Sequence, residues 1–189
     1  MRIIAGRFGG LHLQVPKRDV RPTADRVKES VFSVLGTDLV DARVLDLFAG
    51  TGGLGLEALS RGARHARFVE RAKGSLAALE TNLKRCQVTD QEAEIDPRPV
   101  ASAIAFLVTT RAQFDVIFAD PPYAQAANLL VPVLHHAPRL LTPAGQLVLE
   151  HRRQDRSPVL PVGLSLEDSR TYGDTLVWWI RARDPSSAP

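Results

Sequence analysis

The chain has 189 residues, of which 44% are hydrophobic and 24% are charged, and its formal net charge is +3. This size and composition predict one soluble globular domain, and no apolar run approaches the roughly 20 residues that a membrane-spanning helix needs. The single cysteine, Cys86, excludes an internal disulfide and a multi-cysteine zinc site, and no signal-peptide pattern is present, so we expect a cytoplasmic protein with no metal and no membrane partner.

The first 40 residues predict a small β-hairpin followed by a helix. Residues 2–5 and 11–15 are short β-type runs, and the stretch between them contains three glycines. A helix is expected from about Thr23 until Gly36 ends it. We expect this extension, residues 1–40, to precede a main domain at residues 41–183. The tail, residues 184–189, is expected to be disordered because it has almost nothing apolar to bury.

From residue 43, predicted strands and helices alternate. The strands are expected at 44–48, 66–70, 94–96, 114–119 and 145–150, and the helices at 54–61, 72–85, 101–108 and 125–136. Repeated β-α-β units require a parallel sheet with helices on both faces. Residues 164–168 and 175–181 are typical of a closing antiparallel hairpin. The predicted fold is α/β: a Rossmann-like, doubly wound sheet of about seven strands, mostly parallel.

A glycine-rich loop follows the first of these strands. Gly50, Gly52 and Gly55 form a G-x-G-x-x-G motif between a predicted strand and a predicted helix, which is the context of a nucleotide-binding loop. Glu70 ends the next strand, where a carboxylate can accept hydrogen bonds from ribose hydroxyls. The motif fits a nicotinamide dinucleotide, S-adenosylmethionine or a turn used only for packing. Asp46 favours S-adenosylmethionine, because a carboxylate repels a pyrophosphate and attracts an ammonium and a sulfonium.

The segment Asp120-Pro121-Pro122-Tyr123 directly follows the apolar strand at 114–119, so it is predicted on the same rim as the glycine loop. Its prolines remove two amide donors, which leaves the Asp120 carboxylate and the Pro121 carbonyl to accept hydrogen bonds from an amino group. Tyr123 offers a face for stacking on a base. Such acceptors localise the nitrogen lone pair toward a methyl sulfonium, and alignment then supplies the rate gain. The segment predicts amino methylation, with a capped Pro-Pro turn as the alternative.

Basic side chains are concentrated near the N-terminus. Residues 1–28 carry a net charge of about +5 and the remainder about −2, and a basic arm is typical of proteins that dock on polyphosphate. A solvated basic surface is the alternative. The predicted RNA contacts in this arm are Arg2, Arg7, Lys17, Arg18, Arg21 and Lys28. Arg152 and Arg153 follow the strand at 145–150 and are either a second phosphate contact or a solvated turn.

Several blocks resemble known methyltransferases. Residues 45–63, 68–71 and 114–123 look like the conserved blocks of class I methyltransferases that modify amino groups. Residues 1–16, 21–35 and 170–175 are more narrowly similar to the bacterial small-subunit ribosomal RNA guanine-N2 methyltransferases, the RsmD family. The resemblance covers nearly the whole chain except the tail. It implies methyl transfer from S-adenosylmethionine to the N2 amine of a guanine in small-subunit ribosomal RNA, either free or in a particle.

The resemblance also implies roles for particular residues. The donor site would be lined by Asp46, Phe48, Ala49, Gly50, Thr51, Gly52, Glu70, Arg71 and Ala101, with Thr23 and Arg26 bordering its methionine end. Asp120, Pro121, Pro122 and Tyr123 would hold the guanine, and the N-terminal hairpin would grip RNA. The sequence departs from the family pattern after the third strand, where an Asp or Asn is usual and residues 98–102 read RPVAS. A backbone amide is a candidate for the adenine contact there.

Other functions stay open at this stage. A DNA adenine or cytosine amino-methyltransferase shares the Asp-Pro-Pro-Tyr block, but 189 residues leave no room for a separate target-recognition domain. A small-molecule or protein amine methylase fits the basic arm less well. An inactive RNA-binding assembly factor with a methylase fold would not need Asp46, Glu70 and Asp120. A nicotinamide oxidoreductase is the last alternative, and nothing in the sequence demands more than a monomer.

Overall fold

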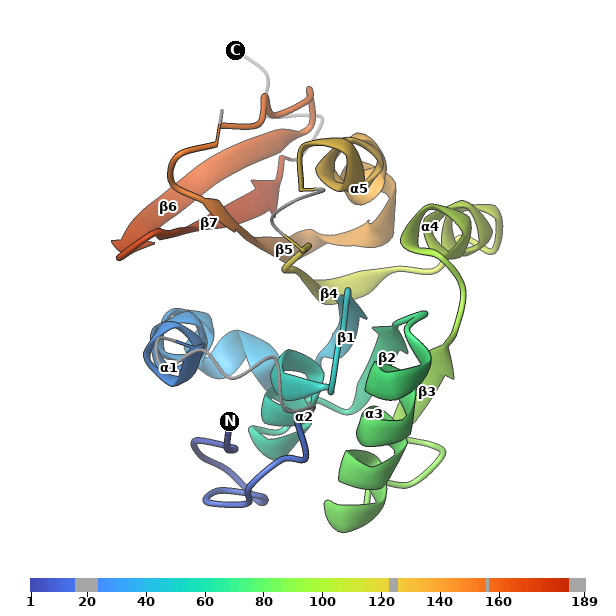
Figure 1. Cartoon of the computed structure of the whole chain (residues 1–189). Coiled ribbons are helices and arrows are strands. Elements are labelled where there is room, and N and C mark those ends of the chain that lie inside the picture. Colours follow the sequence, from blue (N-terminus) through green and yellow to red (C-terminus); the bar gives the residue numbers. More distant parts are fainter. Residues whose placement is uncertain (16–23, 123–125, 156, 184–189) are drawn as a thin grey trace.

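The protein is built on a seven-stranded sheet with the strand order β3-β2-β1-β4-β5-β7-β6 (Figure 1). The computed structural model describes residues 1–15, 24–122, 126–155 and 157–183. The strands are β1 (Arg43–Leu47), β2 (His65–Val69), β3 (Ala93–Asp96), β4 (Phe114–Ala119), β5 (Leu141–Arg152), β6 (Leu164–Tyr172) and β7 (Thr175–Ala182). The helices are α1 (Ala24–Leu35), the short 3-10 helix η1 (Gly36–Leu39), α2 (Gly53–Ser60), α3 (Lys73–Arg85), α4 (Val100–Thr109) and α5 (Ala126–Leu140).

The pairing of the strands confirms the predicted fold class. Strands β1 to β5 pair in parallel, and the connections between them run through helices. Strand β7 is antiparallel to β5, and β6 is antiparallel to β7, so the chain closes with the expected C-terminal hairpin. The first strand lies inside the sheet because the chain winds outward from it in both directions, and this places a strand-order reversal between β1 and β4.

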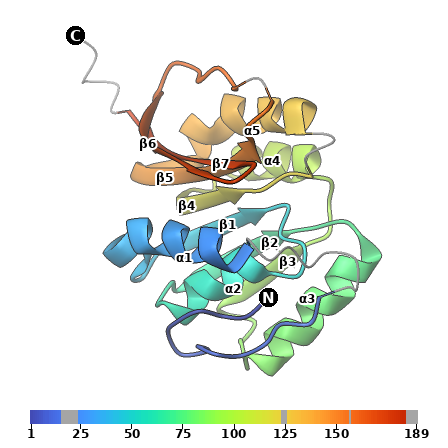
Figure 2. The same ribbon diagram turned by 60° about the vertical axis from the view of Figure 1, so that its left-hand side comes forward.

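Helices cover both faces of the sheet (Figure 2), and each face has its own hydrophobic core. Helices α1, α2 and α3 contribute to one core, and α4 and α5 contribute to the other. Successive side chains of a strand point to opposite faces, so Val44 belongs to the first core and Leu45 to the second. Burial on both faces therefore fixes the register of the inner strands and the level at which each one ends.

Strand β5 is longer than the sequence predicted. Phe114 of β4 pairs with Leu141, and after an irregularity Val116 pairs with Gln146, so regular pairing begins about where the prediction placed it. Gly145 lies in the irregular part, where a Cβ would come within 3.0 Å of the Phe114 carbonyl oxygen. The prediction therefore found the regular part of β5 and missed the irregular start, which follows α5 without a break.

The N-terminal residues form a looser hairpin than predicted. A single bridge joins Arg2 to His12, and backbone hydrogen bonds join the Ile3 amide to the Leu11 carbonyl (2.9 Å) and the Leu13 amide to the Met1 carbonyl (3.1 Å). Ile3 and Leu13 are buried in the same core as α1, α2 and α3. The division between residues 1–40 and 41–183 stays a prediction, and the tail at 184–189 lies outside the described residues. Within the described ranges, no helix has the length and apolar content needed to cross a bilayer.

Candidate active site

The carboxyl ends of three neighbouring strands stop at one level. Leu47 of β1 pairs with Val69 of β2 on one side and with Ala119 of β4 on the other. The next residues along the chain, Phe48, Glu70 and Asp120, therefore leave the sheet at the same edge. Parallel strands lie about 4.8 Å apart, so the backbones at Glu70 and Asp120 are separated by roughly 10 Å across β1. The register thus brings the glycine loop, Glu70 and Asp120 together at one edge, which we call the carboxyl edge.

The glycine loop is a tight turn with an unusual backbone. Phe48, Gly50 and Gly52 have φ angles of 66°, 55° and 87°, in the left-handed region. A non-glycine residue in this region stores about 1 kcal/mol or more of strain, and such residues gather at functional sites. Gly55 is required for a different reason, because a Cβ there would lie 2.3 Å from the Phe68 ring, against which α2 packs. The loop is therefore held close to the sheet.

Asp46 lies beneath the loop rather than beside open solvent. Its side chain is only 2% exposed, and Oδ2 accepts a hydrogen bond from the Gly55 amide at 2.8 Å. Burial raises the pKa of Asp46 to about 7, the Gly55 amide opposes this, and the charge of Glu70 adds to it. A buried carboxylate with this pKa gains from a cation nearby, which fits the ammonium and sulfonium groups expected of the donor. Its predicted place in the donor site stays a prediction.

Glu70 connects the glycine loop to the turn after β2. Its Oε2 accepts a hydrogen bond from the Gly50 amide (2.9 Å), and Oε1 accepts hydrogen bonds from the amides of Arg71 and Ala72 (2.7 Å each). Three amides therefore fix a half-buried carboxylate in one orientation. A carboxylate has about four lone-pair positions, so Glu70 keeps capacity for a further donor such as a ribose hydroxyl. This geometry suits the predicted role of Glu70.

Asp120 and Pro121 follow β4 at the same edge. Asp120 is half-buried, Pro121 is buried and Pro122 is exposed. Tyr123, predicted to stack on the base, lies outside the described residues, as does Thr23, predicted near the methionine end of the donor. Arg26 is described and lies exposed on α1. The roles predicted for these residues stay predictions.

Asn82, which sequence reasoning missed, supports the loop from α3. It is fully buried, and its Nδ2 donates to the carbonyl of Thr51 at 3.0 Å and to the carbonyl of Gln14 at 3.0 Å. Its Oδ1 accepts from the Gln14 amide at 2.7 Å. This side chain therefore joins the glycine loop to the N-terminal segment. An asparagine inside a predicted helix carries no local signal of such a role.

The turn after β3 is the place where the sequence departs from the family pattern. Strand β3 ends at Asp96, which is 3% exposed, and Arg98 occupies both of its carboxylate oxygens with bonds from Nε (2.7 Å) and Nη2 (2.6 Å). Burial alone would raise the pKa of Asp96, but the hydrogen bonds and charge of Arg98 outweigh it and lower the pKa. The Asp96 carboxylate is therefore occupied. Ala101 lies exposed in the first turn of α4, where amides lack intrahelical acceptors, and the expected backbone contact with adenine stays a prediction.

Lys28 is a correction to the predicted RNA contacts. Its side chain is 4% exposed, its Nζ lies 3.2 Å from Glu57 Oε2, and it donates a hydrogen bond to the carbonyl of Arg2. Burial lowers the pKa of Lys28, and Glu57 opposes this. Glu57 is also fully buried and accepts hydrogen bonds from the amides of Ile4 (2.7 Å) and Ala5 (3.1 Å). Lys28 therefore neutralises a buried carboxylate and is not available to phosphate.

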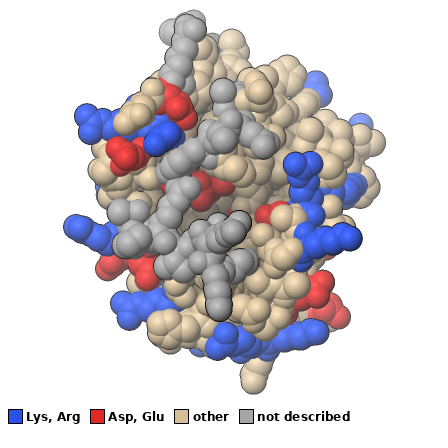
Figure 3. All heavy atoms as spheres, in the orientation of Figure 1, with Lys and Arg blue, Asp and Glu red and all other residues tan. Residues whose placement is uncertain are grey.

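The other predicted RNA contacts divide between two edges of the sheet. Arg7 forms an ion pair with Glu92 at 2.5 Å, and its amide donates to the carbonyl of Ser60, at the end of α2 far from the glycine loop. Arg152 and Arg153 are exposed at the carboxyl edge, at and just beyond the end of β5. Arg2 is exposed as well, while Lys17, Arg18 and Arg21 lie outside the described residues. The space-filling view (Figure 3) shows acidic side chains near the centre of one face and most Lys and Arg toward its periphery.

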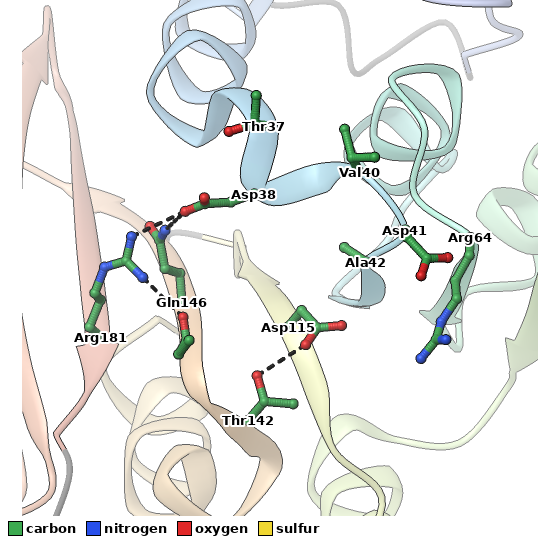
Figure 4. A pocket seen from close by; sticks show the side chains of 11 residues that line it. Thr37, Asp38, Val40, Asp41, Ala42, Arg64, Asp115, Thr142, Gln146 and Arg181 are labelled. Carbon is green, nitrogen blue, oxygen red and sulfur yellow. Dashed lines mark hydrogen bonds and ion pairs between the residues drawn. The ribbon is translucent and has the colours of Figure 1, made fainter.

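A cavity of about 430 Å³ lies at the opposite edge, where β1 and β4 begin (Figure 4). Its charged and polar side chains largely bind one another: Asp38 accepts a hydrogen bond from Arg181 at 3.1 Å, and Asp115 accepts one from Thr142 at 3.0 Å. The glycine loop, Glu70 and Asp120 all lie away from it. Because ligands of doubly wound sheets bind outside the carboxyl ends of the strands, we do not assign the methylation site to this cavity.

Solved structures share this fold. A SAM-dependent methyltransferase from Agrobacterium tumefaciens superposes with a TM-score of 0.62 at 21% identity, over 73% of this chain and 47% of that chain, which shows the fold alone. A hypothetical protein of Thermus thermophilus superposes with a TM-score of 0.83 at 29% identity, over 96% of this chain and 99% of that chain. Fold and site define a class I methyltransferase, dependent on S-adenosylmethionine.

Within that class, the chain belongs to the RsmD family. Residues 1–181 match the family described as "Conserved hypothetical protein 95". A relative from Escherichia coli strain K12, named "Ribosomal RNA small subunit methyltransferase D", is 32% identical over 180 residues, which cover 92% of this chain and 85% of that protein. A relative of the same name from Haemophilus influenzae is 40% identical over 138 residues, 69% of this chain and 70% of that protein. The family resemblance stated from the sequence is confirmed.

Proposed function

We propose that the protein transfers the methyl group of S-adenosylmethionine to the N2 amine of a guanine in small-subunit ribosomal RNA. The names of the relatives support this substrate. The observation that carries the proposal is the common level of Glu70 and Asp120 on either side of β1, with the glycine loop between them. Glu70 would hold the donor on one side of β1, and Asp120 would hold the amine on the other side.

The residues of the donor site fit S-adenosylmethionine, which supplies an electrophilic methyl group when bound. Glu70 has a fixed carboxylate for the ribose hydroxyls, and the buried carboxylate of Asp46 gains from positive charge above the loop. Gly50 has a left-handed backbone and no side chain, so a ligand can approach the backbone of the loop closely at this residue. These features hold the donor and provide negative charge where the ligand is cationic.

Asp120 and Pro121 would act on the amino group. The Asp120 carboxylate and the Pro121 carbonyl accept hydrogen bonds from its two N–H groups, which turns the nitrogen lone pair away from the base ring and toward the methyl carbon. The nitrogen gains a bond to the methyl carbon as the carbon–sulfur bond breaks, and it becomes cationic. Its extra proton then passes to Asp120 or to water. Positioning and preorganised polarity supply the rate gain, and no strong base is needed.

The same proposal includes how the protein contacts RNA and in which state it acts. Arg2, Arg152 and Arg153 would contact phosphates of the RNA, either free or in a small-subunit particle. Residues 1–40 would form the RNA-contacting extension and 41–183 the catalytic domain. We propose a cytoplasmic monomer, because none of these roles needs a second subunit.

Labelled methyl transfer tests the proposal. Wild-type protein, Asp120→Ala and a control, Asp90→Ala, which changes an exposed carboxylate in the loop between α3 and β3, are given S-adenosylmethionine with unmodified small-subunit RNA, assembled particles or duplex DNA. We expect label on a guanine N2 with wild type and Asp90→Ala. Asp120→Ala should lose transfer while binding the donor within a few-fold of wild type. Label on DNA alone would overturn the substrate, and an active Asp120→Ala would overturn the mechanism.

A further inference from the structure

His151 is a buried titratable side chain that the mechanism above does not use. It lies near the end of β5, its side chain is 2% exposed, and its ring meets the Trp178 ring edge to face at 5.2 Å between centroids. Its Nδ1 lies 3.1 Å from the carbonyl oxygen of Arg152. A carbonyl only accepts, so Nδ1 carries the hydrogen and Nε2 carries a lone pair. His151 therefore presents an acceptor on the side of the ring away from Arg152.

The Nε2 acceptor has no hydrogen-bond partner among the described residues, although it is buried. A buried polar atom without a partner is unfavourable, and its retention calls for an explanation such as a bond formed only in the functional state. Burial lowers the pKa of His151, and the Arg152 carbonyl and the charge of Asp155 oppose this. The ring is thus neutral near pH 7, and Nε2 remains an acceptor.

The register places His151 next to the segment that binds the amine. Ala119 of β4 pairs with Leu149 of β5, so two residues further on Pro121 and His151 stand at the same level. Pairing between β4 and β5 ends at Leu149, whereas β5 and β7 stay paired as far as Arg152. Beyond Leu149, β5 has no paired partner on its β4 side, and the chain continues from the end of β4 into Asp120 and Pro121. Leu149 and His151 point to the same face of the sheet, since they are two residues apart.

An acceptor beside the amine site distinguishes the bases chemically. In guanine, the carbon that bears the exocyclic amine lies between N3, which is an acceptor, and N1, which carries a hydrogen. In adenine and cytosine, the ring atom next to the amine is an acceptor without a hydrogen. An amine held by Asp120 and Pro121 therefore brings a donor toward the neighbouring acceptor only when the base is guanine. The other two bases would bring two lone pairs together.

We propose that His151 is a specificity-determining residue whose Nε2 accepts a hydrogen bond from N1–H of the target guanine. This inference rests on the proposed function and adds a reason why guanine is selected over adenine and cytosine. The Arg152 carbonyl fixes the tautomer, and Trp178 holds the ring plane. His151 contributes recognition of the base, and Asp120 remains responsible for the amine.

The test uses a base that keeps the amine and loses the neighbouring hydrogen. The modified guanosine is first mapped with wild-type protein, and small-subunit RNA is then prepared with either guanosine or 2-aminopurine riboside at that position. Methyl transfer, as kcat/KM, is measured for wild type, His151→Leu, His151→Gln and the control His135→Leu, an exposed histidine of α5. Binding of S-adenosylhomocysteine and thermal unfolding are measured for each variant, so that a folding defect is recognised.

We expect wild type and His135→Leu to prefer guanosine over 2-aminopurine strongly. In His151→Leu this preference should fall about tenfold, the value of one neutral hydrogen bond, and His151→Gln should restore part of it because its carbonyl accepts. An unchanged preference in folded His151→Leu would overturn the inference while leaving the proposed function intact. Absence of transfer by wild type to any guanosine would instead overturn the proposed function. If His151→Leu does not fold, the absence of any preference for guanosine in wild type would equally overturn the inference.

Discussion

The buried carboxylate of Asp46 makes a prediction about stability and pH. Its pKa is raised from 3.8 to about 7, chiefly by burial. A carboxyl group whose pKa is higher in the folded state contributes most below its unfolded pKa, and the contribution is lost as pH rises through about 7. The difference corresponds to about 4 kcal/mol between the two limits. Asp46→Asn cannot ionise, so its free energy of unfolding relative to that of wild type should rise between pH 5 and pH 8 by an amount up to this value.

Urea unfolding at pH 5, 6, 7 and 8 measures the effect. The free energy of unfolding of wild type should fall relative to Asp46→Asn across this range, while Asp90→Asn, an exposed substitution, should run parallel to wild type. The amide group introduced by Asp46→Asn needs partners for two hydrogens, so the free energy of unfolding of the variant can be lower than that of wild type at pH 5. The prediction concerns only how the difference between the two changes with pH. A wild-type-to-variant difference that is constant between pH 5 and 8 would refute the raised pKa.

The same group predicts how donor binding depends on pH. If the cationic donor favours ionised Asp46, its affinity for wild type should rise about tenfold between pH 6 and pH 8, because about nine-tenths of the carboxyl must first lose its proton at pH 6. Calorimetry in two buffers of different ionisation enthalpy should show proton release on binding at pH 6. Asp46→Asn should show neither effect. Equal affinity of the variant and wild type at pH 8 would mean that the carboxylate does not act on the donor.

Three further predictions concern binding and stability. Glu70→Ala should weaken S-adenosylhomocysteine binding by roughly ten- to a hundredfold, since it removes the ribose acceptor and frees the Gly50 loop; unchanged affinity by calorimetry would mean that the loop is misassigned. Glu57→Ala leaves the buried lysine of α1 without its partner and should lower the urea unfolding free energy by about 3–5 kcal/mol, and a loss under about 1 kcal/mol would contradict the buried ion pair. Replacing Arg152 and Arg153 by alanine should weaken RNA binding and flatten its salt dependence, whereas Arg7→Ala at the opposite edge should not; the reverse result would move the RNA surface.

The sequence predicts the fold well because its signals are local and repeated. Strand β4 was predicted at its observed bounds, and α3 and α4 within one residue at each end, since apolar periodicity and glycine or proline breaks coincide there. The start of β5 was missed because its irregular pairing depends on the Phe114 carbonyl of a neighbouring strand. The N-terminal pairing was overestimated because side chains of α2 and α3, together with a few backbone hydrogen bonds, hold that segment in place of a regular ladder.

The candidate site shows the same division. The position of Glu70 and Asp120 at the carboxyl edge could be predicted because each directly follows a recognisable strand, and parallel strands end at a common edge. The burial of Lys28 depends on Glu57, which is 29 residues away in the sequence. No local sequence pattern distinguishes a buried lysine from an exposed one. The hydrogen bonds of Asn82 and the burial of His151 could likewise not be predicted from the sequence, because only the folded chain creates them.

The attachment of the N-terminal segment also sets an order of events during synthesis. The amide of Ile4 needs Glu57, 53 residues later, and Gln14 needs Asn82, 68 residues later. A ribosome adds about 5–20 residues per second, so several seconds would pass between the synthesis of Ile4 and Gln14 and the synthesis of their partners. This segment is then fixed only after α2 and α3 have been made. In the finished protein it should be a separate unit of local opening, with backbone amides that exchange with solvent before those of the central strands.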